Sequence, residues 1–432
     1  MRILWITSRL LPDACRAIGC REQVVGGWMQ SLLAALIRRF GNTHQYFILS
    51  SDRRYCDVQI GCVHHRSFGD GTVTYGKCVP GKVEAEACRA ISEFRPDIIH
   101  IHGTEFFYGR MRKGTYSGVP TVVSLQGIIH GCQAHFNGEI SREELWVHQF
   151  NLRRFLLGRS IFGEQKQWRK KRVSQEALVF KTHNNFVGRT DWDRAWTNML
   201  NPQARYYHVN EIMRDEFYSG IHRSRDIVRP HSIYCSAATT YPLKGAHVIL
   251  RAVAMVKDKY PDIQVRFCSA TRLTEESNLV SAIKAEQYNS YLRHIIKNLG
   301  ISNNVIGLGK LNAAEVAAEL SRAEVFVLPS FCENSPNSLG EAQLVGTPAV
   351  ATYVGGVPSI LCCGEEGLLV PSGDPASLAA KIDWVFSHPE KADAFAEKAK
   401  AAAIVRYNAE SNAEAMMETY TKICAGLCSK SS

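Results

Sequence analysis

The stretch VFVLPSFCENSPNSLGEAQLVGTPAVATYVGGVPSIL, from Val325 to Leu361, decides the fold. It opens with a short apolar run rich in β-branched residues, which is typical of a strand buried on both faces. A polar loop follows, and Ser335 and Pro336 then predict a helix start, with Ser335 as the N-cap and Pro336 at the first helical position. Gly346 predicts the end of this helix. A buried strand, a loop, a capped helix and another apolar run together predict a parallel α/β sheet.

Two glutamates flank the start of this helix. Glu333 lies in the loop and Glu341 lies inside the helix, with seven residues between them. Carboxylates accept hydrogen bonds from adjacent hydroxyl pairs, and both sugars and ribose offer such pairs. The amides at a helix start bind anions such as phosphate. The segment therefore predicts a site for a sugar, a diphosphate and a ribose, whereas two glutamates without this context would indicate no more than an exposed helix.

The same alternation of strand and helix extends over most of the chain. Apolar runs predict strands at Ile3–Thr7, Tyr46–Leu49, Ile98–Ile101, Thr121–Ser124, Ser232–Cys235, Val265–Cys268, Val305–Leu308, Val325–Leu328 and Ala349–Thr352. Helices are expected at Trp28–Phe40, Val83–Phe94, Ala246–Lys259, Ser277–Leu299, Ala313–Ser321, Pro336–Val345 and Pro375–Ser387. This order predicts two Rossmann-like α/β domains, in which ligands bind outside the carboxyl ends of the strands.

The alternation breaks between about residues 131 and 230, a stretch that is aromatic and basic. Residues 141–230 contain 17 Lys or Arg against 10 Asp or Glu, a net charge of +7. We therefore expect a helical basic insertion, about 131–230, in an N-terminal domain that spans residues 1–229. The C-terminal domain is expected at 230–405, with the boundary near Arg229–Pro230. A helix at Ala409–Leu427, within residues 406–432, is expected to return to the N-terminal domain.

Composition excludes several classes of protein. The 432 residues are 45% hydrophobic and 21% charged, which excludes a disordered or collagen-like chain. The net charge of +10 favours anionic partners. No apolar run reaches the ~18 residues of a membrane span, and the start MRILWITSRLLP is interpreted as a first strand, so a cytoplasmic location is expected. The 14 cysteines include no C-x-x-C pair, so reduced, buried thiols are expected rather than a zinc ribbon.

The spacing of Glu333 and Glu341, in its strand–loop–helix setting, resembles the Glu-x7-Glu signature of retaining GT-B glycosyltransferases, in particular glycosyltransferase family four. The resemblance is strongest from Ser232 to Val370. It implies two Rossmann-like domains that face each other across a cleft. It also implies that the first glutamate contacts the donor sugar, that the second binds the nucleotide ribose, and that amides at the helix start bind the diphosphate. Carried over to this chain, the diphosphate role falls on Ser335, Asn337, Ser338 and Leu339.

Two further loops that follow strands contain residues suited to phosphate. Lys244 precedes a helix, so an ammonium group and helix-start amides converge there, and the resemblance places the donor-phosphate lysine at this position. Gly26 and Gly27 follow the first strand and match the family's glycine loop, although a plain loop-to-helix turn is the alternative. The family usually has an arginine shortly before its lysine, where this chain has Ala238 and Thr239. Arg189 is one candidate to supply the missing charge.

Histidines and a glutamine lie near the ends of two expected strands. His100 and His102 alternate on one face, and no other ligand set joins them at a suitable spacing, so packed or cleft-lining side chains are expected rather than a metal site. Many relatives have a histidine where this chain has Gln126, and His130 comes four residues later. Both are expected to line the cleft. The expected catalytic residues are Glu333, Lys244 and His130.

Asp191 and Asp193 form a D-x-D pair in GRTDWDRAW. In another glycosyltransferase fold this pattern holds a divalent metal. The resemblance to GT-B enzymes instead assigns the phosphate charge to lysine and helix amides. Two carboxylates at a helix start are therefore the preferred interpretation, and neither a metal site nor a cofactor is expected.

Residues 153–172 carry eight Lys or Arg against one acidic residue, Glu164, and include apolar residues near helical spacing. Two interpretations stay open. The helix lies on an anionic membrane surface, or it packs its apolar side on the N-terminal domain with the cations in water. No RNP, KH or helix-turn-helix pattern is present, so a nucleic-acid partner is not expected.

These observations lead to one expected function and two alternatives. The expected function is a retaining, hexosyltransferase-type enzyme that moves a sugar from a UDP- or GDP-linked donor to a hydroxyl of a glycan or lipid-linked saccharide, in cell-surface polysaccharide biosynthesis. The enzyme is expected in the cytoplasm, with peripheral membrane contact left open. A sugar-nucleotide epimerase or phosphorylase on the same fold is one alternative. A non-catalytic sugar- or nucleotide-binding protein is the other, favoured by the missing arginine.

Overall fold

The computed structural model describes residues 1–21, 26–68, 81–111, 114–116, 118–149, 160–218, 221, 223–236, 241–268, 273 and 287–428. The chain forms two compact units, each built from segments that are distant in sequence. The first unit comprises Met1–His130, Trp168–Arg214 and Tyr407–Ser432. The second comprises Gly131–Gln167 and Asp215–Arg406.

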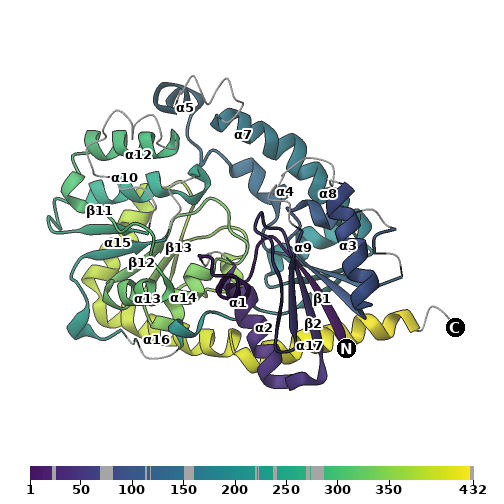
Figure 1. The fold of residues 1–432 in the computed structure, drawn as a ribbon. Coiled ribbons are helices and arrows are strands. Elements are labelled where there is room, and N and C mark those ends of the chain that lie inside the picture. Colours follow the sequence, from purple (N-terminus) through teal and green to yellow (C-terminus); the bar gives the residue numbers. More distant parts are fainter. Residues whose placement is uncertain are drawn as a thin grey trace. The chain divides into compact units, whose positions relative to one another are not determined.

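The first unit contains an eight-stranded sheet (Figure 1). All neighbouring strands are parallel except β3, which runs antiparallel to β4. In spatial order the strands are β3 (Asp57–Ile60), β4 (Val63–Ser67), β2 (Gln45–Ser50), β1 (Arg2–Thr7), β5 (Ile98–His102), β6 (Thr121–Ser124), β7 (Asn185–Gly188) and β8 (Arg205–His208). Its helices are α1 (Pro12–Ala17), α2 (Gly27–Phe40), α3 (Gly81–Phe94), α8 (Val173–Thr182), α9 (Asp191–Leu200) and α17 (Ala409–Cys428).

Strand β1 shows how this sheet is buried on both faces. Ile3 and Trp5 belong to a core cluster with side chains of α2 and α17, and Leu4 and Ile6 belong to a second cluster with side chains of α3 and α8. All four are fully buried, because successive side chains of a strand point to opposite faces and both faces are covered. Helix α17, at the yellow end of the chain in Figure 1, lies beside α2.

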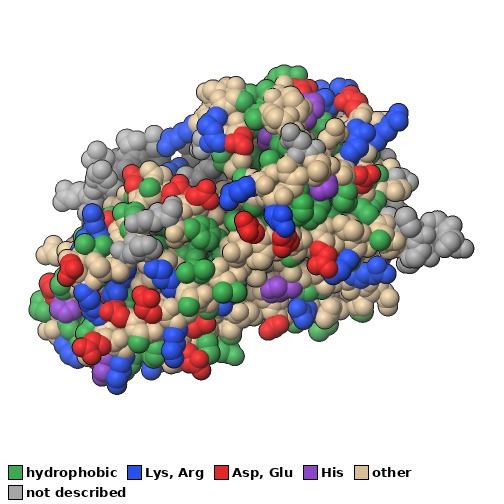
Figure 2. Space-filling model, turned by 90° about the horizontal axis from the view of Figure 1, so that it is seen from below, with side chains coloured by type: hydrophobic (Ala, Val, Ile, Leu, Met, Phe, Trp, Pro, Cys, Tyr) green, Lys and Arg blue, Asp and Glu red, His purple; other side chains and the backbone are tan. Residues whose placement is uncertain are grey.

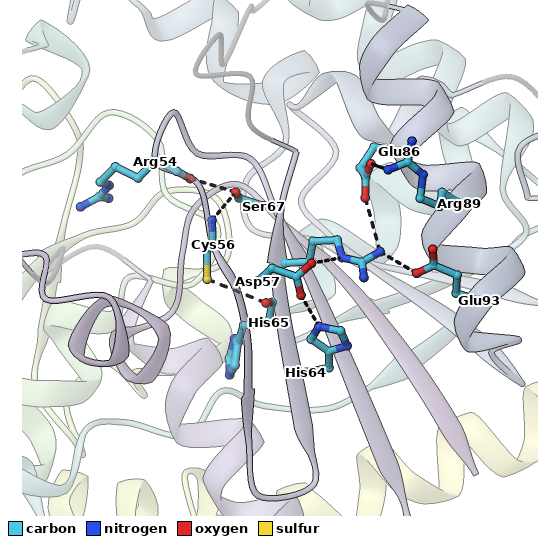
Figure 3. Close-up of polar contacts among 10 residues, drawn as sticks. Arg54, Cys56, Asp57, His64, His65, Ser67, Glu86, Arg89 and Glu93 are labelled. Atoms are coloured by element: carbon cyan, nitrogen blue, oxygen red, sulfur yellow. Dashed lines mark hydrogen bonds and ion pairs between the residues drawn. The ribbon is translucent and has the colours of Figure 1, made fainter.

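A cluster of charges holds the outer edge of this sheet (Figure 3). The Arg66 guanidinium on β4 donates to Asp57 on β3 at 3.1 Å, and to Glu93 and Glu86 on α3 at 2.8 and 3.5 Å. Asp57 also contacts the ring of His64 at 2.5 Å. The Arg66 side chain is only 14% exposed, so three carboxylates compensate a cation that is largely removed from water.

The second unit contains a six-stranded, fully parallel sheet. Its strands, in spatial order, are β11 (Val305–Gly307), β10 (Gln264–Phe267), β9 (Ser232–Cys235), β12 (Val325–Leu328), β13 (Ala349–Thr352) and β14 (Leu368–Val370). Its helices are α5 (Arg142–Gln149), α7 (Ile161–Gln167), α10 (Ala246–Val256), α12 (Gln287–Asn298), α13 (Ala313–Arg322), α14 (Asn337–Val345), α15 (Pro375–Ser387) and α16 (Pro389–Arg406). A short helix, α4 (Ile129–Cys132), and a π-helical turn at Trp168–Arg172 lie where the chain passes between the units.

The strands and helices predicted from the sequence are confirmed outside residues 131–230, since every expected strand is present within one residue of its expected ends. Inside that stretch the prediction of a complete break is wrong, because β7 and β8 extend the first sheet there. Each is only four residues long, and β8 is an edge strand with charged or polar residues at both ends, so neither shows an apolar run. The expected helix at Ser277–Leu299 is present from Gln287, and its earlier residues lie outside the described part of the chain.

The division into units differs from the expected boundary near Arg229–Pro230. The longer segment of the second unit begins at Asp215, because the turn at Asp215–Phe217 packs against α13 and α14. The segment Gly131–Gln167 also belongs to the second unit, where α5 packs against α12. Half of the expected basic insertion is therefore associated with the second sheet.

The surface carries both signs of charge. On the face shown in Figure 2, basic and acidic side chains are interspersed rather than gathered by sign. Within the described residues, no helix combines the length and apolar character that a bilayer crossing requires.

Candidate active site

The strand order of the second sheet places two loops at a topological switch point. Strands β9 and β12 are neighbours, while the chain continues from β9 to β10 on one side and from β12 to β13 on the other. In open parallel sheets, ligands bind in the crevice that such a reversal leaves at the carboxyl ends of the strands. Lys244 lies in the connection after β9, and Glu333 lies in the loop after β12.

These two expected site residues form an ion pair. Lys244 Nζ donates to Glu333 Oε1 at 2.7 Å, and Ser330 Oγ donates to the same oxygen at 2.7 Å. The Lys244 side chain is 32% exposed and that of Glu333 is 11% exposed. Burial opposes the charge of Lys244, but the Glu333 carboxylate outweighs burial and raises the lysine pKa above its usual value. Lys244 is therefore a cation at neutral pH, as a phosphate ligand must be.

Direct backbone packing holds the two loops together. Phe331 N donates to the carbonyl of Leu243 at 2.8 Å. Gly245 adopts a left-handed conformation with φ +72°, and a Cβ at this position would overlap the carbonyl oxygen of Pro329. Only glycine allows this approach, and the approach fixes Lys244 beside Glu333.

A third loop, after β13, supports Glu333 from its backbone. Gly356 N donates to the Glu333 carbonyl at 3.0 Å, and Gly355, at φ +52°, leaves no room for a Cβ against that carbonyl. No role was expected for these glycines or for Ser330 from the sequence. Paired glycines directly after a strand, in YVGGVP, are the signal that marks the close approach.

The start of α14 differs in detail from the prediction. The predicted N-cap at Ser335 is wrong: Pro336 occupies the N-cap position, without a side-chain cap, and the helix begins at Asn337. Proline fixes its own φ and precedes the first turn, which moves the helix start by one residue. Leu339 N already donates to the Pro336 carbonyl at 3.0 Å, so the amides of Asn337 and Ser338 precede the first backbone bond of the helix. The expected end at Gly346 is confirmed, in a left-handed conformation.

Helix α14 carries two of the side chains that the sequence predicts to bind the donor, Asn337 and Glu341. Asn337 Oδ1 is buried and has no hydrogen-bond partner among the described residues, so it is available to a donor group on a ligand. Glu341 is half-buried, and its carboxylate interacts electrostatically with Tyr234 on β9. Burial is the main cause that raises the pKa of Tyr234, with Cys268 and Glu341 adding to it.

The segment that follows α4 packs onto this same site. Cys132 Sγ lies 3.2 Å from Cys332 Sγ, next to Glu333 in sequence. His247 Nε2 bonds the carbonyl of Gly138 at 2.9 Å, and the His247 ring stacks on Phe331 with centroids 5.6 Å apart. Residues 132–138 therefore contribute to the surroundings of Lys244 and Glu333 within the second unit.

In the first unit, the glycine pair starts α2 as expected. Gly26 is the N-cap, with φ +96°, and Gly27 is the first helical residue. The aliphatic part of Arg214 lies 3.1 Å from the position that a Cβ on Gly27 would take. The sequence gives no local signal for Arg214, because it lies 187 positions after the glycine that it covers. The expected arginine positions, Ala238 and Thr239, lie outside the described residues.

Arg189 has a partner inside the first unit. It forms an ion pair with Glu211 and donates to the Leu125 carbonyl, and its side chain is 6% exposed. Asp193 is fully buried, caps α9 together with Thr190, and accepts from Tyr206 Oη at 2.6 Å. Asp191 and Asp193 therefore lie at the start of a helix. The Asp193 carboxylate is already hydrogen-bonded to Tyr206 and to backbone amides at that helix start. No group of three or more possible metal ligands is present among the residues that the structure describes.

The histidines of the first sheet divide into two kinds. His100 and His102 are fully buried, and burial lowers the pKa of both rings. His100 bonds the hydroxyls of Tyr420 and Ser124, each at 2.6 Å, which confirms the expected packing role. His130, in contrast, is 15% exposed and contacts Glu176 on α8. Gln126 lies half-buried at the end of β6.

Comparison with known proteins shows which family part of the chain resembles. Residues 221–402 match the family model described as Glycosyl transferases group 1. This range contains Lys244, Ser330, Glu333 and Gly355, which the geometry brings together, and it also contains Glu341. Residues 221–402 are therefore similar to the glycosyltransferase domain of group 1 enzymes. The resemblance noted in the sequence is confirmed over this range.

Named relatives match a similar length of chain. The D-inositol 3-phosphate glycosyltransferase of Corynebacterium urealyticum is 32% identical over 183 residues, which are 42% of this chain and 41% of that protein. The protein of the same name from Paenarthrobacter aurescens is 32% identical over 165 residues, 38% of each chain. The chain thus covers about two fifths of the length of the curated relatives that it matches.

Solved structures match the glycosyltransferase domain and the first unit together. Sucrose-phosphate synthase from Thermosynechococcus elongatus has a TM-score of 0.73 at 14% identity, over 99% of this chain and 100% of that one. Anabaena HepE in complex with UDP-glucose has a TM-score of 0.65 at 15% identity, over 98% and 100%. The chain therefore has the GT-B fold, with two Rossmann-like α/β domains, as expected from the sequence.

Proposed function

We propose that this chain is a retaining, hexosyltransferase-type glycosyltransferase that transfers a sugar from a nucleotide-diphosphate sugar to a hydroxyl of a glycan or lipid-linked saccharide. The observation that carries the proposal is the Lys244–Glu333 pair at the switch point of the group 1 domain, beside the start of α14. A cation, a carboxylate and helix-start amides are the groups that a diphosphate and a sugar require together.

The donor is proposed to lie along the β9, β12 and α14 loops. Lys244 and the amides of Asn337 and Ser338 bind the diphosphate, Glu333 accepts from hydroxyls of the sugar, and Glu341 accepts from the ribose. Anabaena HepE, which has the same fold, was crystallised with UDP and with UDP-glucose, so a UDP-linked donor is the first to test and a GDP-linked donor the second.

The charge arrangement suggests how the donor is activated. In the free protein Lys244 pairs with Glu333. A bound diphosphate offers Lys244 a more highly charged partner, which leaves the Glu333 carboxylate to the hydroxyls of the sugar. As the glycosidic bond breaks, negative charge grows on the leaving diphosphate, and Lys244 and the helix amides stabilise it. In a front-face reaction, the leaving phosphate also takes the proton of the acceptor hydroxyl, and the configuration at the sugar is retained.

The first unit is proposed to supply the remaining groups. The Gly27 amide at the start of α2 is suited to phosphate, and Arg214, which covers Gly27, is a candidate for the missing arginine charge. Arg189 would take that role only if its pair with Glu211 opened. His130 is proposed to contact a sugar hydroxyl.

The acceptor is proposed to be a saccharide of cell-surface polysaccharide biosynthesis. The relatives named for D-inositol 3-phosphate match only part of their length, and the family match excludes the first unit, so inositol 3-phosphate joins the acceptors to be tested. A peripheral membrane location remains part of this proposal. Arg169, Lys170 and Lys171 are exposed, whereas residues 150–159 lie outside the described part.

A two-step experiment tests the function. A thermal-shift screen with UDP, GDP, ADP and their glucose, mannose and N-acetylglucosamine derivatives should show one nucleotide that raises the melting temperature, because a ligand of the native state stabilises it. NMR of the products with that donor and a panel of saccharides should then show a new glycosidic bond with the anomeric configuration of the donor. An inverted product would refute retention. Epimerised donor without transfer would identify an epimerase, and binding without turnover a non-catalytic protein.

Flotation with vesicles tests the location. Wild type should float with anionic phosphatidylglycerol vesicles at low salt, because each basic residue near such a surface contributes about 1 kcal/mol. The variant with Arg169, Lys170 and Lys171 changed to Ser should float less. A control with Lys297, Lys391 and Lys398 changed to Ser loses the same charge from exposed positions elsewhere. Equal flotation of the two variants would refute specific docking by the π-helical turn.

A further inference from the structure

Glu176 is a buried carboxylate that the mechanism above does not use. It lies on α8, and its side chain is fully buried. The same helix carries Val179 and Phe180, both fully buried in the core beneath the first sheet. Packing of α8 thus determines where the carboxylate lies. A charged group at such a depth requires compensating partners, and their identity indicates its role.

Four donors converge on this carboxylate. Oε1 accepts from Thr104 Oγ1 at 2.8 Å and from Ile129 N at 3.0 Å. Oε2 accepts from His130 N at 2.9 Å and lies 2.6 Å from His130 Nδ1. Thr104 follows β5, and Ile129 and His130 follow β6. Glu176 therefore joins two loops at the carboxyl ends of neighbouring strands, where α/β sheets bind ligands.

The arrangement determines the tautomer of His130. Two backbone N–H groups and a hydroxyl already donate to the carboxylate oxygens, so Glu176 faces His130 as a hydrogen-bond acceptor. His130 Nδ1 then carries the hydrogen of this contact, and in the neutral form of the ring Nε2 presents a lone pair. Among the described residues no group bonds Nε2, and the ring is partly exposed, 6.1 Å from the ring of Trp196.

We propose that Glu176 is a positioning residue, which holds His130 in the Nδ1–H tautomer so that Nε2 accepts a hydrogen bond from a hydroxyl of the bound sugar. The inference rests on the proposed function, since it names the group that His130 contacts. It explains why a helix outside the glycosyltransferase domain carries a buried carboxylate aimed at this ring. A purely structural Glu176 would need its bonds to the two amides and Thr104, but it would not need the ring.

Three variants separate positioning from structure. Glu176→Gln keeps the shape and removes the charge. His130→Asn places an amide N–H near the position of Nδ1, so it retains the bond to Glu176 and loses Nε2. Thr104→Val removes one donor to Glu176 without touching His130, and serves as the control. Long-range ¹H–¹⁵N spectra of histidine-labelled protein report the tautomer, and steady-state kinetics with the sugar nucleotide of the largest thermal shift report kcat and KM.

We expect the Nδ1–H tautomer in wild type and in Thr104→Val, and a shift toward Nε2–H in Glu176→Gln. The kcat should fall about 10- to 100-fold in Glu176→Gln and His130→Asn, with little change in KM and in the melting temperature of His130→Asn. A wild-type Nε2–H tautomer, or a His130→Asn variant with wild-type kcat, would overturn the proposal even if Glu176→Gln failed to fold. A wild type without transfer activity would overturn the proposed function and, with it, the sugar contact.

Discussion

Glu333 is hydrogen-bonded through both its side chain and its backbone, which makes it the most constrained residue of the candidate site. Its carboxylate accepts from Lys244 and Ser330, while its carbonyl accepts from Gly356 N. Glu341, eight positions later on α14, interacts instead with Tyr234. The two carboxylates therefore have different neighbours, and we expect them to bind different parts of a donor.

Substitution of each glutamate by alanine tests this division. Glu341→Ala should weaken UDP binding about tenfold, or about 1.4 kcal/mol, because the ribose hydroxyls lose their acceptor. Glu333→Ala should reduce turnover strongly and change UDP affinity little, because UDP carries no sugar for it to contact. Calorimetry with UDP and rate assays measure both effects, with the exposed Glu365→Ala as the control. Equal losses of UDP affinity in the two variants would refute the division of roles.

Glu105 makes the stability of the first unit depend on pH. Burial, aided by the nearby Glu176 carboxylate, raises the pKa of Glu105 to about 7, and Oε2 has no hydrogen-bond partner among the described residues. The folded state therefore holds a proton that the unfolded state releases near pH 4.5. The stabilisation from this proton is complete below that pH and is lost as the pH rises through about 7.

The Glu105→Gln variant should therefore gain stability relative to the wild type as the pH rises, since glutamine mimics the protonated side chain at every pH. The difference in unfolding free energy, variant minus wild type, should increase by about 1–3 kcal/mol between pH 5 and pH 8.5. Urea unfolding of the two proteins across this range measures the difference. A difference that stays constant or decreases would show that Glu105 is ionised in the folded protein throughout.

At the scale of elements, three loops meet at Glu333, and glycine makes the closest of these contacts possible. Gly355→Ala should displace the Glu333 carbonyl and abolish donor binding, because both the positive φ and the missing space exclude a Cβ. Gly364→Ala is a matched control, since Gly364 has φ +80° with nothing within 4 Å of its Cβ position. It should cost about 1 kcal/mol of stability and leave UDP affinity unchanged. Calorimetry with UDP decides, and similar affinities in both variants would contradict the packing argument.

The stability of the β3–β4 edge of the first sheet depends on the Arg66 guanidinium. Arg66→Met leaves Asp57, Glu86 and Glu93 without their shared partner and should destabilise the edge by about 1–3 kcal/mol. Hydrogen exchange of β3 and β4 should rise accordingly. Arg39→Met is the control, because its pair with Glu414 is half exposed and such pairs contribute about 0–1 kcal/mol. Unchanged exchange in Arg66→Met would show that the cluster is solvated and contributes little.

Elements whose composition matches their burial could be predicted from the sequence. Val325–Leu328 is predicted as a buried strand because all four residues are apolar. The switch-point rule, together with the family resemblance, predicted that Lys244 and Glu333 belong to one site. Strand β7 has only Phe186 and Val187 between polar or small neighbours, so its pairing in the sheet is not visible locally. Ser330 and the glycines after β13 were missed because their contacts depend on how the loops pack. Phe136 and Leu145 are apolar and buried, but the sequence does not indicate which sheet they pack against.

At the scale of the whole molecule, neither unit is a continuous stretch of chain. The first unit includes α17, and the Tyr420 hydroxyl on that helix accepts from Trp5 Nε1 at 3.1 Å and bonds His100 Nδ1 at 2.6 Å. All three side chains are fully buried. A helix from the end of the chain therefore satisfies polar groups in two central strands of the first sheet.

Tyr420→Phe should cost about 1–3 kcal/mol, because a buried indole N–H loses its acceptor. Hydrogen exchange should rise in β1, α2 and α17 and stay unchanged in β12 and α14 of the second unit. Tyr353→Phe, at a residue 67% exposed, should leave both units unchanged. A uniform rise across both units would show that they unfold together.

The position of α17 also has a consequence for synthesis. The ribosome delivers Trp5 415 residues before the tyrosine that completes its surroundings. The second unit ends at Arg406, so its sheet can close while the chain is still being extended. At roughly 5–20 residues per second, the face of β1 that carries Trp5 is left without α17 for about 20–80 seconds. The first unit is therefore completed after the second, and we expect chaperones to bind its uncovered apolar surface during that interval.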